Sequence, residues 1–366
     1  MSKTGYLTHL EIRGFRSIAD MSLELEPLNI LIGPNGAGKS NFINFFRFMN
    51  KLLQKDLQLY VAEQGGADSL LHFGRKKTPE LRTYLRFDPN SYGATLVPTN
   101  DGRLVFKEEF CEFFADKIGY IGGKKKKSLA KPGVDESGLP NPGRVSIESN
   151  VSRYIADWKV YHFHDTSSTA PVKQAGELLD SDRLREQGEN LAAFLYDIQQ
   201  HWPDAYARIV TTVQRVAPFF HDFILEPDRH NSSKIRLRWK HKGSDAFFDA
   251  HALSDGTLRF ICMATLLLQP ELPSVVLLDE PELGLHPYAI QLLGSMLRSA
   301  SQSTQIIAST QSVTLANEFA SENMVIVEHH DNSSTFKRLD AKALETWLED
   351  YRLGDLWEKN LLGGTP

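Results

Sequence analysis

One glycine-rich stretch, GPNGAGKS at residues 33–40, has the residue types and the spacing that bind nucleotide phosphates. Its glycines let backbone N–H groups approach the phosphates, and the helix that follows adds positive potential at its N-terminus. Lys39 would reach the β- and γ-phosphates, and the Ser40 hydroxyl would ligate Mg²⁺. The residues expected to bind the nucleotide here are Asn35, Gly36, Ala37, Gly38, Lys39, Ser40 and Asn41.

Two adjacent carboxylates, Asp279 and Glu280, provide the second element that a nucleotide hydrolase needs. They follow an apolar run at residues 274–278 that predicts a buried strand. At the carboxyl end of that strand, Asp279 would lie beside the Mg²⁺ shell and Glu280 would polarise the attacking water. The predicted metal ligands are therefore Ser40 and Asp279. The predicted catalytic residues include Glu280 and Lys39.

A third motif, LSDGT at residues 253–257, opens a predicted helix. Serine and glycine at the start of a helix make an anion site, which here would be formed by Ser254 and Gly256. Ser254 precedes Asp279 by 25 residues. In this order and at this spacing, the motif resembles the signature of ABC ATPases.

Four stretches in sequence order resemble the RecF/SMC-type branch of ABC ATPases. They are the P-loop, LSDGT, LLDEPELGLHP at 277–287 and IIASTQS at 306–312. The opening EIRGFRSI at 11–18 resembles the first strand of that branch. Further stretches resemble a short, stand-alone, OLD/RecF-like family of predicted bacterial ATPases: LHFGRK at 71–76, WKVYHFHDTS at 158–167 and EDYRLGDLWEKNLLGG at 349–364. The resemblance spans most of the chain, except roughly 107–150.

This resemblance implies a mechanism that uses ATP and Mg²⁺ as cofactors. Heads of this branch dimerise head-to-tail and sandwich two ATP molecules. Ser254 and Gly256 would contact, in trans, the γ-phosphate that the other subunit holds. Residues 282–286 resemble the D-loop, which crosses the dimer interface. The resemblance also implies that Arg16 contacts nucleotide, while the alternative is a surface charge on a hairpin.

Gln311 departs from the pattern of transporter-type ABC proteins. Those proteins place a histidine after the last core strand, and here residues 310–312 are Thr-Gln-Ser. Gln311 could hydrogen-bond a γ-phosphate or water, but it cannot take up a proton at neutral pH. We therefore expect it in a catalytic position and expect slow turnover. The position of the Q-loop stays open, with His72 and Phe73 as candidates.

The expected fold class is α/β. It is an ABC-type P-loop ATPase head with an N-terminal antiparallel β subdomain and an inserted helical lobe, and nucleotide lies at the carboxyl ends of the strands. The glycine-, proline- and lysine-rich residues 119–150 predict a loop. The expected divisions are 1–106 (N-terminal ATPase lobe), 107–150 (flexible insertion), 151–252 (helical/β insertion lobe), 253–340 (C-terminal ATPase lobe) and 341–366 (C-terminal helix and tail).

The charge of the chain limits its partners. The net charge of −5 excludes a global basic field, so any DNA contact must come from local patches. Two basic rows are candidates. One is Lys124–Lys127, for which a solvated loop is the alternative. The other comprises Lys234, Arg236, Arg238 and Lys240 on one face of a predicted half-buried strand.

Other features indicate a cytoplasmic protein without a membrane contact. The N-terminus has no apolar signal core, and no run of 18 apolar residues occurs. Cys111 and Cys262 lie in apolar surroundings, which favours buried thiols in a reducing compartment. His162, His164 and Asp165 have types that could ligate a metal. Because no distant cluster completes such a set, a structural or nucleotide-adjacent role is favoured.

Three functions fit these observations. The leading one is a homodimeric or higher-oligomeric ATPase that acts on or senses DNA in repair or phage defence. Because no second acidic cluster follows Asn323, we expect a separate effector or nuclease chain. The second is a slow, ATP-locked oligomeric scaffold that holds an effector inactive. The third, an ATP-binding subunit of a membrane transporter, is disfavoured by the DEPELGLHP and FRS stretches and by the C-terminal tail.

Overall fold

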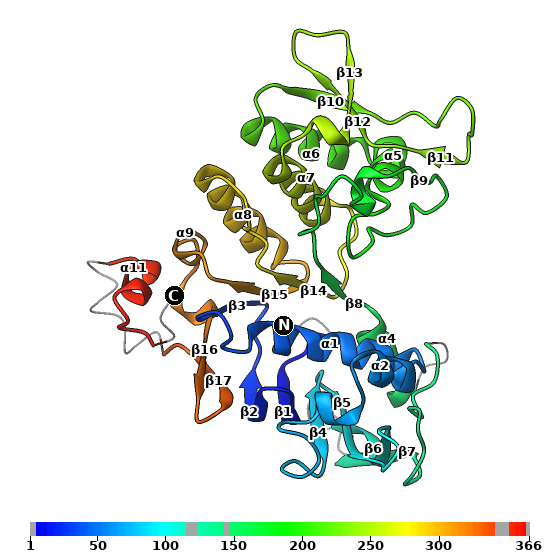
Figure 1. Ribbon diagram of the computed structural model, residues 1–366, viewed down its shortest axis with the longest axis vertical. Helices are drawn as coiled ribbons and strands as arrows, with labels where there is room; N and C mark the ends of the chain where they lie inside the picture. Colours follow the sequence, from blue (N-terminus) through cyan, green and yellow to red (C-terminus); the bar gives the residue numbers. More distant parts are fainter. Residues whose placement is uncertain (1–4, 115–122, 143–145, 341–350, 364–366) are drawn as a thin grey trace. The chain divides into compact units, whose positions relative to one another are not determined.

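The computed structural model describes residues 5–114, 123–142, 146–340 and 351–363 and divides into two compact units (Figure 1). The first unit comprises Met1–Trp158 and Ala320–Pro366, and the second comprises Lys159–Phe319. The P-loop belongs to the first unit. The carboxylate pair and the LSDGT motif belong to the second.

A six-stranded antiparallel sheet forms much of the first unit, drawn in blue to cyan in Figure 1. In the order of the sheet its strands are β2 (Ile18–Glu24), β1 (His9–Phe15), β4 (Leu81–Arg86), β5 (Asn90–Pro98), β6 (Leu104–Phe114) and β7 (Lys124–Ala130). Buried and exposed side chains largely alternate along the β1–β2 hairpin. Leu10 and Ile12 are fully buried, whereas Arg13 is exposed.

The phosphate-binding loop connects a buried strand to a long helix in the first unit. Strand β3 (Leu28–Ile32) is buried along its whole length and pairs parallel with β16 (Met324–His330). Strand β17 (Ser333–Arg338) pairs antiparallel with β16. Helix α1 (Lys39–Leu53) turns an apolar face inward, and its fully buried aromatic side chains are Phe42, Phe45, Phe46 and Phe48.

Shorter helices complete the described part of the first unit. They are α2 (Leu57–Glu63), α3 (Ala67–Leu70), α4 (Ile147–Ala156), the 3₁₀ turn η4 (Ser321–Asn323) and α11 (Leu353–Glu358). The helix predicted at 341–350 lies outside the described residues.

Residues 123–142 differ from the predicted loop. β7 pairs antiparallel with β6, and the predicted boundary at 106/107 falls inside β6 itself. The segment after β7 is also anchored. Lys55 Nζ donates to the carbonyl oxygen of Leu139 at 2.7 Å, and the Glu136 carboxylate accepts the backbone N–H of Leu57 at 3.2 Å. The sequence did not predict this strand, because its four consecutive lysines show no apolar alternation and glycines lie nearby.

The second unit contains a parallel strand pair and several helices, among them the helix that LSDGT was predicted to open. β14 (Val275–Asp279) pairs parallel with β15 (Gln305–Thr310). The helices here are α7 (Asp255–Leu268), α8 (Pro287–Ala300) and α9 (Val313–Ala316). Strand β8 (Trp158–Tyr161) lies at the boundary between the units.

Residues 171–252 add a helical and β part to the second unit. It contains η2 (Pro171–Lys173), β9 (Gly176–Glu177), α5 (Leu191–His201), α6 (Pro203–Val216), β10 (Phe220–Ile224), β11 (Lys234–Ile235), β12 (Arg238–His241), β13 (Phe247–Asp249) and η3 (Ala250–Ala252). The strand predicted over 234–240 is interrupted, because β11 pairs with β9 whereas β12 lies between β10 and β13. Its predicted alternation is nevertheless present, with Ile235, Leu237 and Trp239 buried.

Candidate nucleotide site

The P-loop holds its lysine against its own carbonyl oxygens. Lys39 is only 5% exposed, and its Nζ donates to the carbonyl oxygens of Gly33 at 2.5 Å and Pro34 at 2.9 Å. The ammonium is therefore fixed at the loop rather than extended into solvent. A phosphate oxygen bound at the loop would therefore lie close to the positive charge of Lys39.

Gly38 is the residue at which the loop requires glycine. It caps the N-terminus of α1 with φ at 115°, and a Cβ there would overlap the Ser334 hydroxyl. Ser334 Oγ donates to Ser17 Oγ at 2.7 Å, and Asn41 Nδ2 donates to the same Ser17 oxygen at 2.8 Å. A hydroxyl pair from β17 and the β1–β2 turn thus supports the first turn of α1. Sequence reasoning missed Ser17 and Ser334, because they lie 317 residues apart.

Arg16 is fixed by its neighbours in the first unit. Its backbone is left-handed, with φ at 49°, and its guanidinium donates to Gln64 Oε1. The Arg16 carbonyl oxygen contacts His72 Nδ1 at 2.7 Å. This contact joins the FRS stretch to the LHFG stretch. The nucleotide contact of Arg16 and the Q-loop role of His72 and Phe73 stay predictions.

The carboxylate pair ends β14, as its sequence predicts. Ser309 of β15 binds both residues: its hydroxyl donates to Asp279 Oδ1, and its carbonyl oxygen accepts the Glu280 N–H at 3.1 Å. Glu280 has φ at 45°, a conformation that costs free energy for a residue with a side chain. The parallel pairing of β14 with β15 therefore places both carboxylates at one strand end.

Gln311 lies against the predicted water-activating carboxylate. Its side-chain amide donates to Glu280 Oε1, and its backbone N–H donates to Glu282 Oε1 at 3.2 Å. The Thr310 hydroxyl donates to the same Glu282 oxygen at 2.5 Å. Two sequence-predicted residues, Glu280 and Gln311, thus meet in the structure. Glu282 was predicted only as part of the D-loop stretch.

The signature motif caps its helix and touches the D-loop stretch. Ser254 is the N-cap of α7, and its hydroxyl accepts the Thr257 N–H at 3.2 Å. Gly256 packs against Gly284, while Arg259 Nη1 donates to the Leu283 carbonyl oxygen at 3.2 Å. The signature and the D-loop stretch therefore form one contiguous structure. The expectation that Ser254 and Gly256 contact a partner's nucleotide stays a prediction.

The 162–165 stretch lies beside the carboxylate pair. His164 Nε2 contacts the Asp279 carbonyl oxygen at 2.9 Å, and the His164 carbonyl oxygen accepts from Arg259 Nη2 at 2.8 Å. Asp165 instead accepts the Ser167 N–H at 3.0 Å. Across the described ranges no group of three or more histidine, cysteine, aspartate or glutamate side chains is placed to hold a metal ion. These contacts give His164 a structural role at the end of β14, and the nucleotide-adjacent role stays a prediction.

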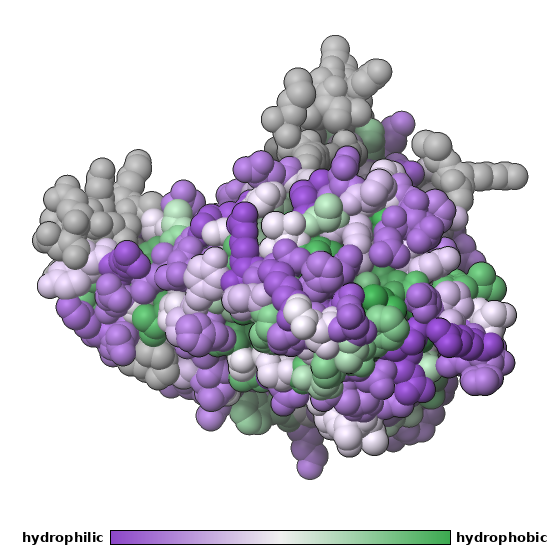
Figure 2. Space-filling model, turned by 90° about the horizontal axis from the view of Figure 1, so that it is seen from above, coloured by the Kyte–Doolittle hydropathy of each residue, from purple (hydrophilic) through white to green (hydrophobic). Residues whose placement is uncertain are grey.

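Carboxylates accompany most cations of the two predicted basic rows. On β7, Lys124 pairs with Glu112, Lys126 with Glu108 and Lys127 with Glu148. In the second row, Lys234 pairs with Glu177, Arg238 with Glu226 and Lys240 with Asp245. Hydrophilic residues predominate on the face shown in Figure 2, with small hydrophobic patches between them. Each row thus carries much less excess charge than its sequence suggests.

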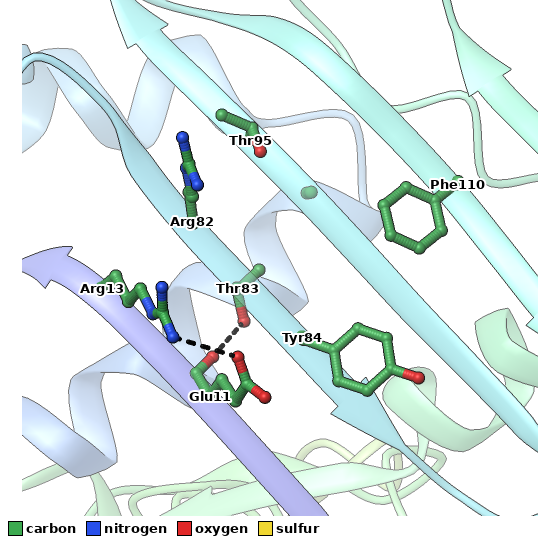
Figure 3. A pocket seen from close by; sticks show the side chains of 8 residues that line it. Glu11, Arg13, Arg82, Thr83, Tyr84, Thr95 and Phe110 are labelled. Atoms are coloured by element: carbon green, nitrogen blue, oxygen red, sulfur yellow. Dashed lines mark hydrogen bonds and ion pairs between the residues drawn. The ribbon is translucent and has the colours of Figure 1, made fainter. Parts of the chain in front are cut away.

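A pocket of about 190 Å³ lies on the antiparallel sheet of the first unit (Figure 3). Strands β1, β4, β5 and β6 line it. The Thr83 hydroxyl donates to the Glu11 carbonyl oxygen at 3.1 Å, and Arg13 lies 3.9 Å from the Glu11 carboxylate. Its lining residues include none of the predicted nucleotide or catalytic residues.

Comparison with solved structures defines the class of fold. The chain resembles the SmcHead bound to the C-winged helix domain of ScpA (TM-score 0.61, 14% identity, 93% of this chain and 99% of that chain). It also resembles the Smc head domain with an extended coiled coil bound to the C-terminal domain of ScpA, derived from Pyrococcus furiosus (TM-score 0.54, 14% identity, 94% and 99%). The predicted α/β P-loop ATPase head with an N-terminal antiparallel sheet is confirmed.

Sequence comparisons refine this class. Residues 6–129 match a family described as "AAA ATPase domain", and residues 139–317 match one described as "AAA domain, putative AbiEii toxin, Type IV TA system". The Old nuclease of Escherichia phage P2 is 21% identical over 93% of this chain, which spans 62% of that protein. The chain is thus similar to ATPases of the OLD and SMC-like kind, and the predicted resemblance to the RecF/SMC-type branch is confirmed. Within the described ranges, no helix has the length and apolar character needed to cross a membrane.

Proposed function

We propose that this chain hydrolyses ATP with Mg²⁺ and uses the cycle to assemble and release a head-to-tail dimer. The contact between the Gln311 amide and the Glu280 carboxylate supports this proposal most directly, since Glu280 follows the end of β14, where we expect a water-activating base. Lys39 would hold the β- and γ-phosphates, and Glu280 would polarise the attacking water. Gln311 would orient that water or the γ-phosphate without taking up a proton.

Ser40 and Asp279 suit the Mg²⁺ ion of this reaction. Both offer oxygen donors, which Mg²⁺ prefers, and Ser40 is exposed while Asp279 is half-buried. A bound Mg²⁺ would neutralise charge on the β- and γ-phosphates. Ser309 would keep the Asp279 carboxylate oriented through its hydroxyl group.

Exposure around the signature supports the dimer. Ser254 is exposed at the start of α7, and Leu283 and Tyr288 are 44% and 49% exposed. Exposed apolar side chains beside an N-terminal anion site suit a surface that closes over a partner's nucleotide. We propose that Ser254 and Gly256 contact the γ-phosphate bound by the other protomer.

We further propose that the dimer acts on or senses DNA in phage defence or repair, together with a separate effector chain. The match to a family described as "putative AbiEii toxin, Type IV TA system" supports a role in defence. The similarity to the Old nuclease supports a role that involves nucleic acid. DNA would bind through Lys124–Lys127 and through the row from Lys234 to Lys240, displacing some of their carboxylate partners.

ATP hydrolysis by the purified chain tests this function, measured with and without linear duplex DNA at low and moderate salt. We expect hydrolysis that requires Mg²⁺ and Lys39 and that rises with DNA at low salt. Hydrolysis that is indifferent to DNA at both salt concentrations would contradict the DNA role. Activity that survives Lys39→Ala would contradict the assigned site.

The ATP-locked scaffold is the second candidate, and Gln311 favours it. A glutamine cannot shuttle a proton, and here its amide also occupies one oxygen of Glu280. In that case ATP would produce a large assembly with little turnover. Light scattering with ATP, read beside phosphate release, separates the two candidates.

A further inference from the structure

Glu282 is a buried carboxylate at the start of the D-loop stretch, and no role in nucleotide binding or hydrolysis has been assigned to its side chain so far. It is 8% exposed, and burial raises the pKa of its side chain. Its Oε2 atom is buried and has no hydrogen-bond partner among the residues that the structure describes. Burying a carboxylate costs free energy unless its contacts compensate, so its position needs a reason.

The contacts of Glu282 fall on two consecutive residues. Its Oε1 accepts the Thr310 hydroxyl at 2.5 Å and the Gln311 backbone N–H at 3.2 Å. The Thr310 hydroxyl oxygen in turn accepts the Ser312 N–H at 2.9 Å. One carboxylate oxygen therefore fixes the backbone directly after β15.

This fixed turn determines where the Gln311 side chain lies. The Gln311 side-chain amide donates to Glu280 Oε1. The backbone N–H of Glu280 donates to the Ser309 carbonyl oxygen, which holds Glu280 in place. The Glu280 carboxylate is thus bound by Gln311 at Oε1, which would leave Oε2 to accept from a water molecule. Without the Glu282 contact, the Gln311 backbone would lose the bond that aims its amide at Glu280.

We propose that Glu282 is a positioning residue for ATP hydrolysis: it holds the Thr310–Gln311 turn so that Gln311 orients the Glu280 carboxylate. The inference rests on the proposed function, because it takes Glu280 as the group that activates water. Glu282 itself touches neither nucleotide nor water in this role.

Kinetics of three single variants test the proposal first. Glu282→Ala leaves the Thr310 hydroxyl and the Gln311 N–H without their acceptor, and we expect kcat to fall about tenfold or more with KM for ATP changed less than about threefold. Glu282→Gln keeps an oxygen that can accept both bonds and should stay within about threefold of wild type. Glu318→Gln is the matched control, because it alters another largely buried carboxylate of the same unit, bound by Arg298.

The double variant shows whether Glu282 acts through Gln311. Glu282→Ala with Gln311→Ala should be no slower than the slower single variant, since both remove the same contact. Multiplicative losses would overturn the proposal, as would a wild-type kcat in Glu282→Ala. A fall in kcat for Glu318→Gln equal to that for Glu282→Ala would assign the effect to general destabilisation and overturn it too.

A measurement without turnover separates this inference from the proposed function. In protein labelled with ¹⁵N-glutamine, the Gln311 side-chain amide is assigned by its loss in Gln311→Ala. We expect its exchange with solvent to be slow in wild type and Glu282→Gln but fast in Glu282→Ala. Equal exchange in all three overturns the positioning role even if the protein hydrolyses no ATP. Absent hydrolysis with the expected exchange pattern overturns only the proposed function.

Discussion

Gly256 packs against Gly284 so closely that a Cβ on Gly256 would lie 2.5 Å from the Gly284 carbonyl oxygen. The signature helix and the D-loop stretch therefore meet through backbone, with no side chain between them. Arg259 of α7 reinforces the junction by donating to the carbonyl oxygens of Leu283 and His164. A change at Gly256 must move one of these segments.

Gly256→Ala should uncouple ATP binding from dimerisation. The new methyl group forces the helix start away from Gly284, at a cost of about 1–3 kcal/mol in the free energy of unfolding. We expect the amount of ATP-dependent dimer, measured by light scattering, to fall at least about tenfold. The affinity of the monomer for ATP should be unchanged. Gly176→Ala is the control, because its Cβ would meet nothing closer than 3.4 Å. Undiminished dimerisation of Gly256→Ala would show that the signature motif is not part of the dimer interface.

Ser254→Arg tests the same surface by size and charge. Ser254 is exposed and caps α7, so the long side chain would project where a partner's γ-phosphate is proposed to lie. We expect ATP binding with an unchanged Kd and no dimer at saturating ATP, as read by analytical ultracentrifugation. A dimer of normal affinity in this variant would be incompatible with the proposed contact.

Lys39→Ala should abolish ATP binding. The variant removes a buried ammonium that is held on the loop carbonyls, and charge-assisted bonds to phosphate of about 1.5–3 kcal/mol each are lost. Calorimetry should show affinity weakened by at least about 100-fold. Lys51→Ala, on the same helix but paired with Asp56 at the surface, should bind ATP normally. Retained binding in Lys39→Ala would place the phosphates elsewhere.

Glu280→Gln should bind ATP and accumulate as a dimer. The amide can still accept from Gln311 but cannot polarise water, so turnover should fall about 100-fold or more while nucleotide stays sandwiched. Size-exclusion chromatography with ATP, followed by nucleotide analysis of the dimer peak, checks both points. Hydrolysis at the wild-type rate would show that another group activates the water.

The stability of Glu282→Gln relative to wild type should depend on pH. Burial raises the pKa of Glu282 in the folded chain, so between its unfolded and folded pKa values the native state binds more protons than the unfolded state. Wild type therefore gains stability as pH falls through the folded pKa, whereas the glutamine variant lacks this gain. Urea unfolding at a series of pH values from 8 down to 4.5, the ordinary value of a glutamate, should show the difference in unfolding free energy shifting toward wild type as the pH falls. A constant difference would contradict the raised pKa.

Sequence periodicity predicted the elements that carry the motifs. The apolar run before Asp279 predicted β14, and the glycine-rich loop and LSDGT each predicted the helix that follows, which are α1 and α7. The contacts that support the site could not be predicted in this way. Ser17 and Ser334 meet across 317 residues, and Glu282 binds the hydroxyl of Thr310, which lies 28 residues further along the chain. Such contacts arise from tertiary pairing, which local pattern does not encode.

The lysine row on β7 also bears on how the chain stays apart from its own copies. In the described part of the sheet, β7 forms one edge, and an edge strand offers unpaired backbone groups to any other strand. Lys124, Lys125, Lys126 and Lys127 are all exposed along it. A second copy approaching that edge would bring its own lysines into register with them. Repulsion between the two lysine rows would thus disfavour edge-to-edge aggregation, whether or not the row binds a nucleic acid.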